Sequence, residues 1–392
     1  MADLTTKQDR SGNKEIIIVW ARTVLESRLL RVANSLDEEG YSVKVLAWDR
    51  ESTKPDIEAH EHFDCHYFHL KTPYNSPLVF LLLPLWWLFT IRFLMKHRPD
   101  AIHPCDLDCL LPSLFYGKMK RIPVIYDIFD VYGKMTERSV PGPFGKILIR
   151  AEAAGARASD AVLMVNRYQH KILGKPALAR KLYLINTPYE VDIEKVNHEK
   201  TTVMKKIPRK FRDRILIFYG GSVEHARRFD FMLRAIEGMD DVLHVVAGTG
   251  ADAKELVPIF EESENTLYIG PIPFVEVLAW STVADILYVL VDSGSEKSRW
   301  GEQSRLYTGM MCGTPLIVTA DVNAAKVVEE NMCGLTVPDN DVDALIAAIK
   351  KLGGDSSLRR KLGENGQKAY LKKYRWNILK KGLLDLYSEL LK

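Results

Sequence analysis

The sequence has few cysteines and almost no excess charge. Its five cysteines are an odd number and lack the spacing of a disulfide framework, which favours a reducing compartment. The 54 basic residues are nearly balanced by 51 acidic ones, so the net charge of +3 is too small to indicate a nucleic-acid-binding protein. No signal-peptide pattern precedes the first apolar run, residues 16–20. We therefore expect a cytoplasmic protein.

What the chain has in abundance is alternation between short β-branched runs and longer amphipathic segments. This alternation is typical of βαβ units with a parallel sheet. The chain has 392 residues, 47% of them hydrophobic, and is longer than the chains that a single hydrophobic core usually supports. In the first half we predict strands at residues 15–20, 42–48, 66–70, 101–103, 123–127, 161–165 and 182–185. In the second half we predict strands at residues 214–219, 242–247, 266–269, 285–290, 315–319 and 335–337.

The predicted fold is therefore α/β, with two Rossmann-like domains that face each other across a cleft. The first domain is expected at residues 1–190 and the second at 214–372. Residues 191–213 are polar, rich in lysine and without clear periodicity, so they are interpreted as a linker. Residues 373–392 are expected to form a helix that can return to the first domain.

In open parallel sheets, ligands bind beyond the carboxyl ends of the strands, so the loops there are the candidate sites. Gly220 and Gly221 follow one predicted strand, and Arg227 and Arg228 precede the next helix. Glycines allow close approach of backbone to a ligand, and arginines with a helix N-terminus suit a diphosphate. The alternative is a plain turn with solvated arginines. Gly248, in a second glycine loop at the next strand end, favours the anion site.

One further segment gives a specific resemblance. Residues 313–318, Gly-Thr-Pro-Leu-Ile-Val, resemble the G-x-P-V-I turn of the family 4 glycosyltransferases, and the helix before them resembles that family's nucleotide-ribose helix. Weaker similarities to the same family lie at residues 28–33, 40–43, 103–112, 124–132 and 186–188. The resemblance implies a GT-B fold, a retaining reaction that needs no metal, and no cofactor beyond the nucleotide-sugar co-substrate.

The resemblance also assigns roles to individual residues. Those implied in donor binding are Gly220, Gly221, Arg228, Gly248, Ile272, Ser304, Arg305, Leu306 and Thr308. Those implied in catalysis are Asp127, Asp130, Arg227 and Glu302. For Asp127 and Asp130, capping of the turn after a strand is an equal alternative.

The sequence departs from the family pattern at three places. Gly221 stands where the family's diphosphate loop has an arginine, and Arg228 is the expected substitute. Trp300 and Thr308 stand where the family has two glutamates that hold the donor sugar and the ribose. Glu302 is close enough to replace the first of them. Phe129 occupies the place of a histidine in the first domain.

Two histidine-containing stretches raise the question of a metal. Residues 60–69 contain four histidines, but in a strand their alternation with Phe63, Cys65 and Tyr67 indicates a half-buried strand. Cys105 and Cys109, near His103, lack a closed tetrahedral spacing. We expect no metal site.

Residues 78–95 are apolar on every helical face apart from Thr90 and Arg92. Pro84 and Arg92 argue against a membrane span. Two alternatives remain, a buried helix and a peripheral helix at the membrane interface, with Trp86 and Trp87 at the lipid headgroups.

The predicted function is transfer of a hexose from a UDP- or GDP-sugar to a glycan or lipid-linked acceptor. It would serve glycan or cell-surface polysaccharide synthesis in the cytoplasm or at the inner face of the cell membrane. Two alternatives stay open. One is a nucleotide-sugar-binding protein with weakened catalysis, because the glutamate pair is absent, and the other is a nucleotide-sugar epimerase of the GT-B fold.

Overall fold

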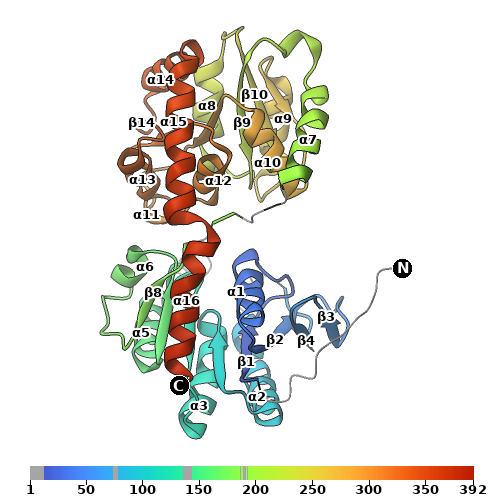
Figure 1. The fold of residues 1–392 in the computed structure, drawn as a ribbon, viewed down its shortest axis with the longest axis vertical. Helices are drawn as coiled ribbons and strands as arrows, with labels where there is room; N and C mark the ends of the chain where they lie inside the picture. The colour runs from blue at the N-terminus through green and yellow to red at the C-terminus, as the bar shows by residue number, and fades with distance from the viewer. Residues whose placement is uncertain (1–12, 74–77, 136–143, 186, 189–190, 192) are drawn as a thin grey trace. The chain divides into compact units, whose positions relative to one another are not determined.

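The β-branched runs of the sequence form the strands of two α/β units. The computed structural model describes the chain except residues 1–12, 74–77, 136–143, 186, 189–190 and 192 (Figure 1). One unit consists of Met1–Ile185 and Leu379–Lys392, and the other of Asn186–Ile378. We call them the first and second units. The predicted end of the first domain, residue 190, and Asn186 of the 186–188 similarity lie outside the described residues.

The first unit is built on a mostly parallel sheet. Its strands are β1 (Glu15–Trp20), β2 (Ser42–Asp49), β3 (Ile57–Ala59), β4 (Asp64–His69), β5 (Ala101–Pro104), β6 (Ile125–Ile128), β7 (Ala161–Met164) and β8 (Lys181–Tyr183). They are ordered β3-β4-β2-β1-β5 and β6-β7-β8, and isolated bridges join β5 to the residues of β6. The sequence did not predict β3, a three-residue antiparallel edge strand, because so short a run carries no periodicity.

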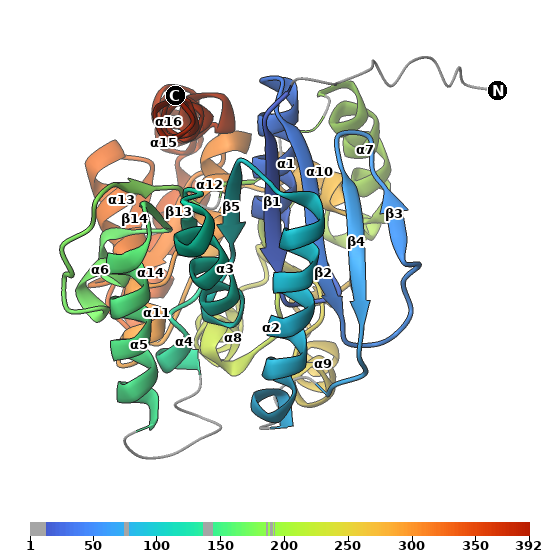
Figure 2. The same ribbon diagram turned by 90° about the horizontal axis from the view of Figure 1, so that it is seen from below.

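Helices connect these strands. They are α1 (Ser27–Glu38), α2 (Leu78–His97), α3 (Leu107–Lys120), α4 (Tyr132–Met135), α5 (Phe144–Ala158), α6 (Arg167–Ile172) and α16 (Trp376–Leu390), the last of which joins this unit from Leu379 on. Alternate residues of β1 and β2, such as Val19 and Trp48, share one apolar core with α2 and α3. A second core joins α3 and α5 to β6 and β7. Thus α2, α3 and α5 cover one face of the sheet (Figure 2).

The second unit has a six-stranded parallel sheet. Its strands are β9 (Ile215–Gly220), β10 (Val242–Ala247), β11 (Thr266–Tyr268), β12 (Ile286–Val289), β13 (Leu316–Thr319) and β14 (Gly334–Val337), ordered β11-β10-β9-β12-β13-β14. Its helices are α7 (Ile193–Lys206), α8 (Phe229–Ile236), α9 (Ala253–Glu262), α10 (Phe274–Val283), α11 (Glu296–Trp300), α12 (Ser304–Cys312), α13 (Asn323–Asn331), α14 (Val342–Gly354) and α15 (Ser356–Ala369), with short 3₁₀ turns at Arg209–Phe211 and His225–Arg227 and a π-helical turn at Tyr370–Tyr374.

Both sheets reverse their strand order at one point. In the first unit the reversal lies between β1 and β5, and in the second it lies between β9 and β12. At such a point the loops leave in opposite directions and open a crevice at the carboxyl ends of the strands. The candidate residues are therefore those that follow β1, β5, β9 and β12.

The predicted linker is mostly helix. Residues 193–206 form α7, which packs against α10 within the second unit. Its apolar residues Val196 and Val203 are buried at a seven-residue spacing. The predicted linker at 191–213 thus includes a helix that the sequence did not indicate, because two buried valines among lysines give too weak a periodic signal to notice.

Helix α2 packs into the first unit through its two tryptophans. Trp86 is fully buried and stacks on Trp48 at 5.7 Å, and the Trp87 indole donates to the Asp108 carbonyl (2.9 Å). The prediction that Trp86 and Trp87 lie at the lipid headgroups is corrected, because one is buried and the other bonds inside the unit. Among the described residues, α2 is the one helix with the length and composition to span a membrane. Contact of this helix with a membrane stays a prediction.

A buried histidine in the second sheet makes stability depend on pH. His244 is fully buried, and its ring nitrogens contact the hydroxyls of Tyr288 (2.9 Å) and Thr266 (3.3 Å). Burial lowers the pKa of His244 from 6.5 to about 3. Between these values the unfolded chain binds a proton that the folded chain does not, so the stability contributed by neutral His244 is present above pH 6.5 and falls as the pH drops.

We expect this single group to lower the free energy of unfolding by roughly 1 kcal/mol between pH 6.5 and about pH 5.5. Urea unfolding of the parent and of His244→Gln at several pH values measures it. The variant should show a shallower dependence on pH in this range. Equal slopes in the two proteins would contradict the assignment.

Candidate functional site

Two glycine loops lie backbone against backbone at the reversal point of the second sheet. The Gly221 N–H donates to the carbonyl of Ala247 (3.0 Å), and the Val223 N–H donates to that of Thr249 (3.1 Å). Gly248 has φ of +131°, and a Cβ added there would lie 1.8 Å from the Gly221 oxygen. No other residue fits at 248 without moving one loop. The two loops predicted to form one site are thus brought together.

Arg305 reaches these loops from the first turn of α12. Its guanidinium lies 4.2 Å from the centroid of the Tyr219 ring, and its Nη1 donates to the Tyr219 hydroxyl. A Cβ at Gly221 would come 2.9 Å from that Nη1. Arg305 therefore fills the space that a side chain at 221 would need. Arg305 thus places a cation, from another element of the fold, where the family pattern has the side chain of residue 221.

The Arg305 guanidinium is desolvated and only partly hydrogen-bonded within the described residues. Its Nε and Nη2 are buried and have no hydrogen-bond partner within the described part of the chain. Burial lowers the pKa of this guanidinium, and the nearby charge of Arg227 lowers it further. A desolvated cation with unused donors is stabilised by an anion, because the anion replaces the hydrogen bonds lost with water.

Arg227 stands beside Arg305. Its Nη1 donates to Oε1 of Gln303 (2.8 Å), and its Nε contacts Oγ of Ser222 (3.3 Å). Gln303, which sequence reasoning missed, is buried at the start of α12 and so holds Arg227 between the glycine loop and that helix. Among the described residues, neither Arg227 nor Arg305 has a carboxylate within 4.0 Å. Two adjacent arginines without an acidic partner make an anion site.

Arg228 forms an ion pair within the second unit. Its Nε and Nη2 both donate to Oδ1 of Asp339, at 3.0 and 2.7 Å, while Oδ2 accepts from the backbone and the hydroxyl of Ser293. This ion pair ties the loops after β9, β12 and β14 together. In this structure Arg228 is engaged with Asp339, and its contact with a donor stays a prediction.

The other residues predicted to bind the donor differ in how far their side chains are exposed. Ser304 is exposed at the helix start, whereas Leu306 is fully buried and its side chain belongs to the core. The Thr308 side chain is nearly buried, and its hydroxyl donates to the Ser304 carbonyl (3.2 Å). In this structure the hydrogen of that hydroxyl is therefore already used, and the contact with a ribose stays a prediction. Ile272 is half-buried in the loop before α10. Of the helix residues predicted to bind the donor, Arg305 has the geometry for it.

Glu302 lies in the loop before α12, and its carboxylate is engaged within the protein. Oε2 accepts from the Tyr307 hydroxyl (2.9 Å) and Oε1 from the Asn323 amide (2.8 Å). Both partners come from helices that border the loop, so the carboxylate fixes α12 to α13. A carboxylate has further lone pairs, and a contact of Glu302 with a sugar remains a prediction.

In the first unit, the predicted carboxylates occupy different environments. Asp127 is fully buried; its Oδ1 accepts from Arg28 and its Oδ2 lies 3.3 Å from Nε2 of His103. Asp130 is exposed in the loop after β6. In this structure the Asp127 carboxylate is enclosed and paired inside the unit, and its contact with a substrate stays a prediction. Asp130 remains the accessible carboxylate of the two.

His103, Cys105 and Asp127 also have ligand atoms within 4.8 Å of one another. In this cluster Arg28 already pairs with Asp127, and Nδ1 of His103 lies 2.6 Å from the Tyr387 hydroxyl. The cluster therefore carries a cation and hydrogen bonds of its own, and we propose no metal for it.

A charged group that the sequence did not indicate follows β1 and β5. Arg22 donates to Asp106 (2.9 Å) and to Glu26 (2.7 Å), and Asp106 also accepts from the backbone of Phe129. Burial works against the charge of Arg22, but the neighbouring carboxylates outweigh it and raise its pKa. Asp106 has φ of +63°, in the left-handed region. This strained residue marks the reversal point of the first sheet as a second candidate site.

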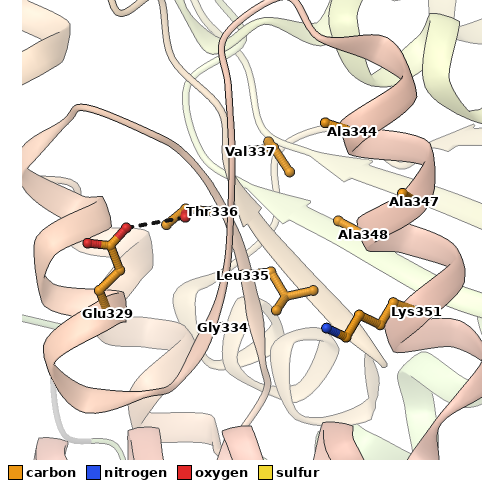
Figure 3. A pocket seen from close by; sticks show the side chains of 9 residues that line it. All are labelled: Glu329, Gly334, Leu335, Thr336, Val337, Ala344, Ala347, Ala348 and Lys351. Atoms are coloured by element: carbon orange, nitrogen blue, oxygen red, sulfur yellow. Dashed lines mark hydrogen bonds between the residues drawn. The ribbon is translucent and has the colours of Figure 1, made fainter.

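A hollow elsewhere in the second unit is separate from this chemistry. It lies along the edge strand β14 and is lined by the small side chains of α14, with Thr336 bonded to Glu329 (Figure 3). None of the glycine-loop residues or arginines lines it. We assign the site to the loops.

Comparison with known proteins identifies the family of the two units. The family model described as Glycosyltransferase Family 4 matches residues 25–192, and the one described as Glycosyl transferases group 1 matches residues 200–369. Two uncharacterized glycosyltransferases of Methanocaldococcus jannaschii are similar. One is 24% identical, covering 47% of each chain, and the other is 26% identical, covering 44% of this chain and 48% of its own. The chain thus spans about half the length of these relatives.

Solved structures match over nearly the whole chain. Sucrose-phosphate synthase from Thermosynechococcus elongatus is similar with a TM-score of 0.73 and 17% identity, covering 96% of this chain and 99% of its own. The Anabaena protein HepE in complex with UDP is similar with a TM-score of 0.72 and 12% identity, covering 96% and 100%. At these identities the likeness establishes the fold. Together with the two family models, which take up most of the sequence, it shows that the chain belongs to the family 4 glycosyltransferases of the GT-B fold, as the sequence predicted.

Proposed function

We propose that this protein transfers a hexose from a UDP- or GDP-sugar to a glycan or lipid-linked acceptor in the cytoplasm. The observation that carries the proposal is the pair Arg227 and Arg305 at the two glycine loops. Both lie at the reversal point of the second sheet, where parallel sheets bind ligands. A nucleoside diphosphate is the anion that two neighbouring arginines and backbone N–H groups would recognise. The structures of HepE in complex with UDP and with UDP-glucose support the same class of ligand.

The two arginines would also serve the reaction. When the sugar leaves, negative charge develops on the diphosphate, and fixed cations in a desolvated site stabilise that charge. Since arginine stays protonated, the site can do this without a metal ion. We propose a metal-independent transfer with retention of configuration, as the family resemblance implies, in the synthesis of glycans or cell-surface polysaccharides. Asp130 is the accessible carboxylate that would meet the acceptor or a sugar hydroxyl.

A nucleotide-sugar-binding protein is the second candidate. It is favoured by the engagement of Glu302 with Tyr307 and Asn323, and by the internal hydrogen bond of Thr308. Turnover separates the two functions. A transferase should slowly release UDP or GDP from a nucleotide-sugar, whereas a binding protein should hold the donor without release.

We expect UDP or GDP to bind at least roughly tenfold more tightly than the matching nucleoside, because two charge-assisted contacts to the diphosphate are worth more than 1.4 kcal/mol. Titration calorimetry of the parent protein with UDP, GDP, uridine and guanosine, in the presence of EDTA, measures this. Equal affinity for nucleoside and diphosphate would contradict a diphosphate site. If binding of UDP or GDP is lost in EDTA, only the proposal that the site needs no metal is contradicted.

A further inference from the structure

The Asp339 carboxylate joins two other loops of the second unit. Its Oδ1 accepts from Nε and Nη2 of Arg228, and its Oδ2 accepts from the N–H and the hydroxyl of Ser293. Burial raises the pKa of Asp339, but the hydrogen bonds from Ser293 and the contacts with Arg228 outweigh it and hold the pKa below its usual value. At neutral pH the carboxylate is therefore charged, and both of its oxygens are engaged.

One partner of Asp339 stands at an unfavourable point of the backbone. Arg228 has φ of +53°, in the left-handed region, between the 3₁₀ turn at His225–Arg227 and the start of α8. A residue with a side chain rarely adopts this conformation, because its Cβ comes close to the backbone. The ion pair with Asp339 holds Arg228 there. Since Arg227 is the last residue of the turn, its direction depends on this same backbone.

The other partner, Ser293, leads to the loop before α12. The Ser293 carbonyl accepts from Nε of Arg299 (2.9 Å), a residue of α11. The chain then runs from α11 to Gln303, whose Oε1 accepts from Nη1 of Arg227 (2.8 Å). Asp339 is thus connected to Arg227 by a second route, which reaches the end of its side chain. The two routes fix the backbone of Arg227 and its guanidinium independently.

We propose that Asp339 is a positioning residue for diphosphate binding, which holds Arg227 in the orientation that the anion requires. This role rests on the proposed function and deepens it, since it adds a residue that acts through Arg227. A carboxylate would itself repel a diphosphate, so its presence beside the arginines calls for another reason than ligand contact. The contacts of both its oxygens supply that reason.

Charge alone predicts the opposite effect of removing this carboxylate. Without the negative charge of Asp339, the neighbourhood of Arg227 and Arg305 becomes more positive, and Arg228 loses the partner that neutralises it. Both changes would strengthen the binding of an anion. Positioning predicts weaker binding, because an Arg227 side chain that is no longer held must be ordered when the ligand binds. The direction of the change therefore separates the two explanations.

The test is titration calorimetry of Asp339→Asn, which keeps the size of the side chain and removes its charge. We expect the affinity for UDP or GDP to fall roughly three- to tenfold, the cost of ordering one long side chain. The affinity for uridine or guanosine should stay near that of the parent, because a nucleoside has no phosphate for Arg227. The matched control is Asp341→Asn. Asp341 is exposed and caps α14, and asparagine also caps helices, so both affinities should stay unchanged.

Hydrogen–deuterium exchange followed by mass spectrometry gives a second readout that needs no ligand. In Asp339→Asn the amides of residues 222–228 and 292–303 should exchange faster than in the parent, because the contacts that join these segments are lost. In Asp341→Asn they should exchange as in the parent. Unchanged exchange in both segments of Asp339→Asn would overturn the role of Asp339.

The binding results also separate this role from the proposed function. If the parent binds UDP or GDP and Asp339→Asn binds it equally or more tightly, the positioning role is overturned and the proposed function stands. The role is likewise overturned if nucleoside and diphosphate affinities fall together, because Asp339 then supports the whole fold of the unit. If the parent itself binds neither UDP nor GDP, the proposed function is overturned and this role with it.

Discussion

The Arg28→Leu variant is expected to lose about 3 to 5 kcal/mol of its free energy of unfolding. Arg28 and Asp127 are both buried and paired, and the Arg28 guanidinium also lies 4.9 Å from the centroid of the Phe129 ring. Removing the arginine leaves a carboxylate enclosed with no cation, which costs far more than the loss of an exposed pair. Urea unfolding of parent and variant measures the change.

Two further variants test the cause. Lys380→Leu breaks the partly exposed Lys380–Glu38 pair in the same unit, and it should cost below about 1 kcal/mol. Arg28→Leu combined with Asp127→Leu removes both charges and should regain most of the loss, because no unpaired charge stays buried. If Arg28→Leu does not fold by itself, recovery of a folded double variant still supports the argument. A cost no larger than that of Lys380→Leu would show that Arg28 does not neutralise Asp127.

Replacing both Arg227 and Arg305 by alanine should give the largest loss of donor binding. Each arginine offers charge-assisted hydrogen bonds worth about 1.5 to 3 kcal/mol, so each single variant should bind UDP or GDP roughly ten- to 150-fold more weakly. The double variant should be weaker than either. Its loss need not equal the sum, since the two side chains lie in one cluster.

Arg305→Lys separates charge from geometry. Lysine keeps the positive charge but loses the planar guanidinium that lies over Tyr219 and the two N–H groups without partners. We expect it to restore only part of the affinity. The matched control is Arg228→Lys, which keeps a cation beside Asp339 and should leave diphosphate affinity near that of the parent. Unchanged affinity in Arg305→Ala would remove Arg305 from the site and with it the main support for the proposed function.

The sequence predicted only some of the residues that make up the two candidate sites. The glycine loops were found because glycine pairs after a strand are a local signal. Gln303 and Asp339 carried no such signal, since a single glutamine or aspartate in a loop is common. The charged group of Arg22, Glu26 and Asp106 was likewise missed. Its members follow different strands, and only the strand order β2-β1-β5 brings them to one reversal point.

Apart from β3 and α7, the sequence by itself determined the alternation of strands and helices, the two-unit α/β organisation and the family, because these follow from periodicity and short motifs that neighbouring residues carry. The tertiary structure decided which arginines have an acidic partner. Arg305 meets Tyr219 across 86 positions, Arg228 meets Asp339 across 111, and Arg28 meets Asp127 across 99. Charge is neutralised by whichever group lies within a few ångströms, and burial sets its strength. For that reason Arg228 pairs with Asp339, Asp127 pairs with Arg28 inside the first unit, and the guanidinium of Arg305 lies where a side chain at Gly221 would be.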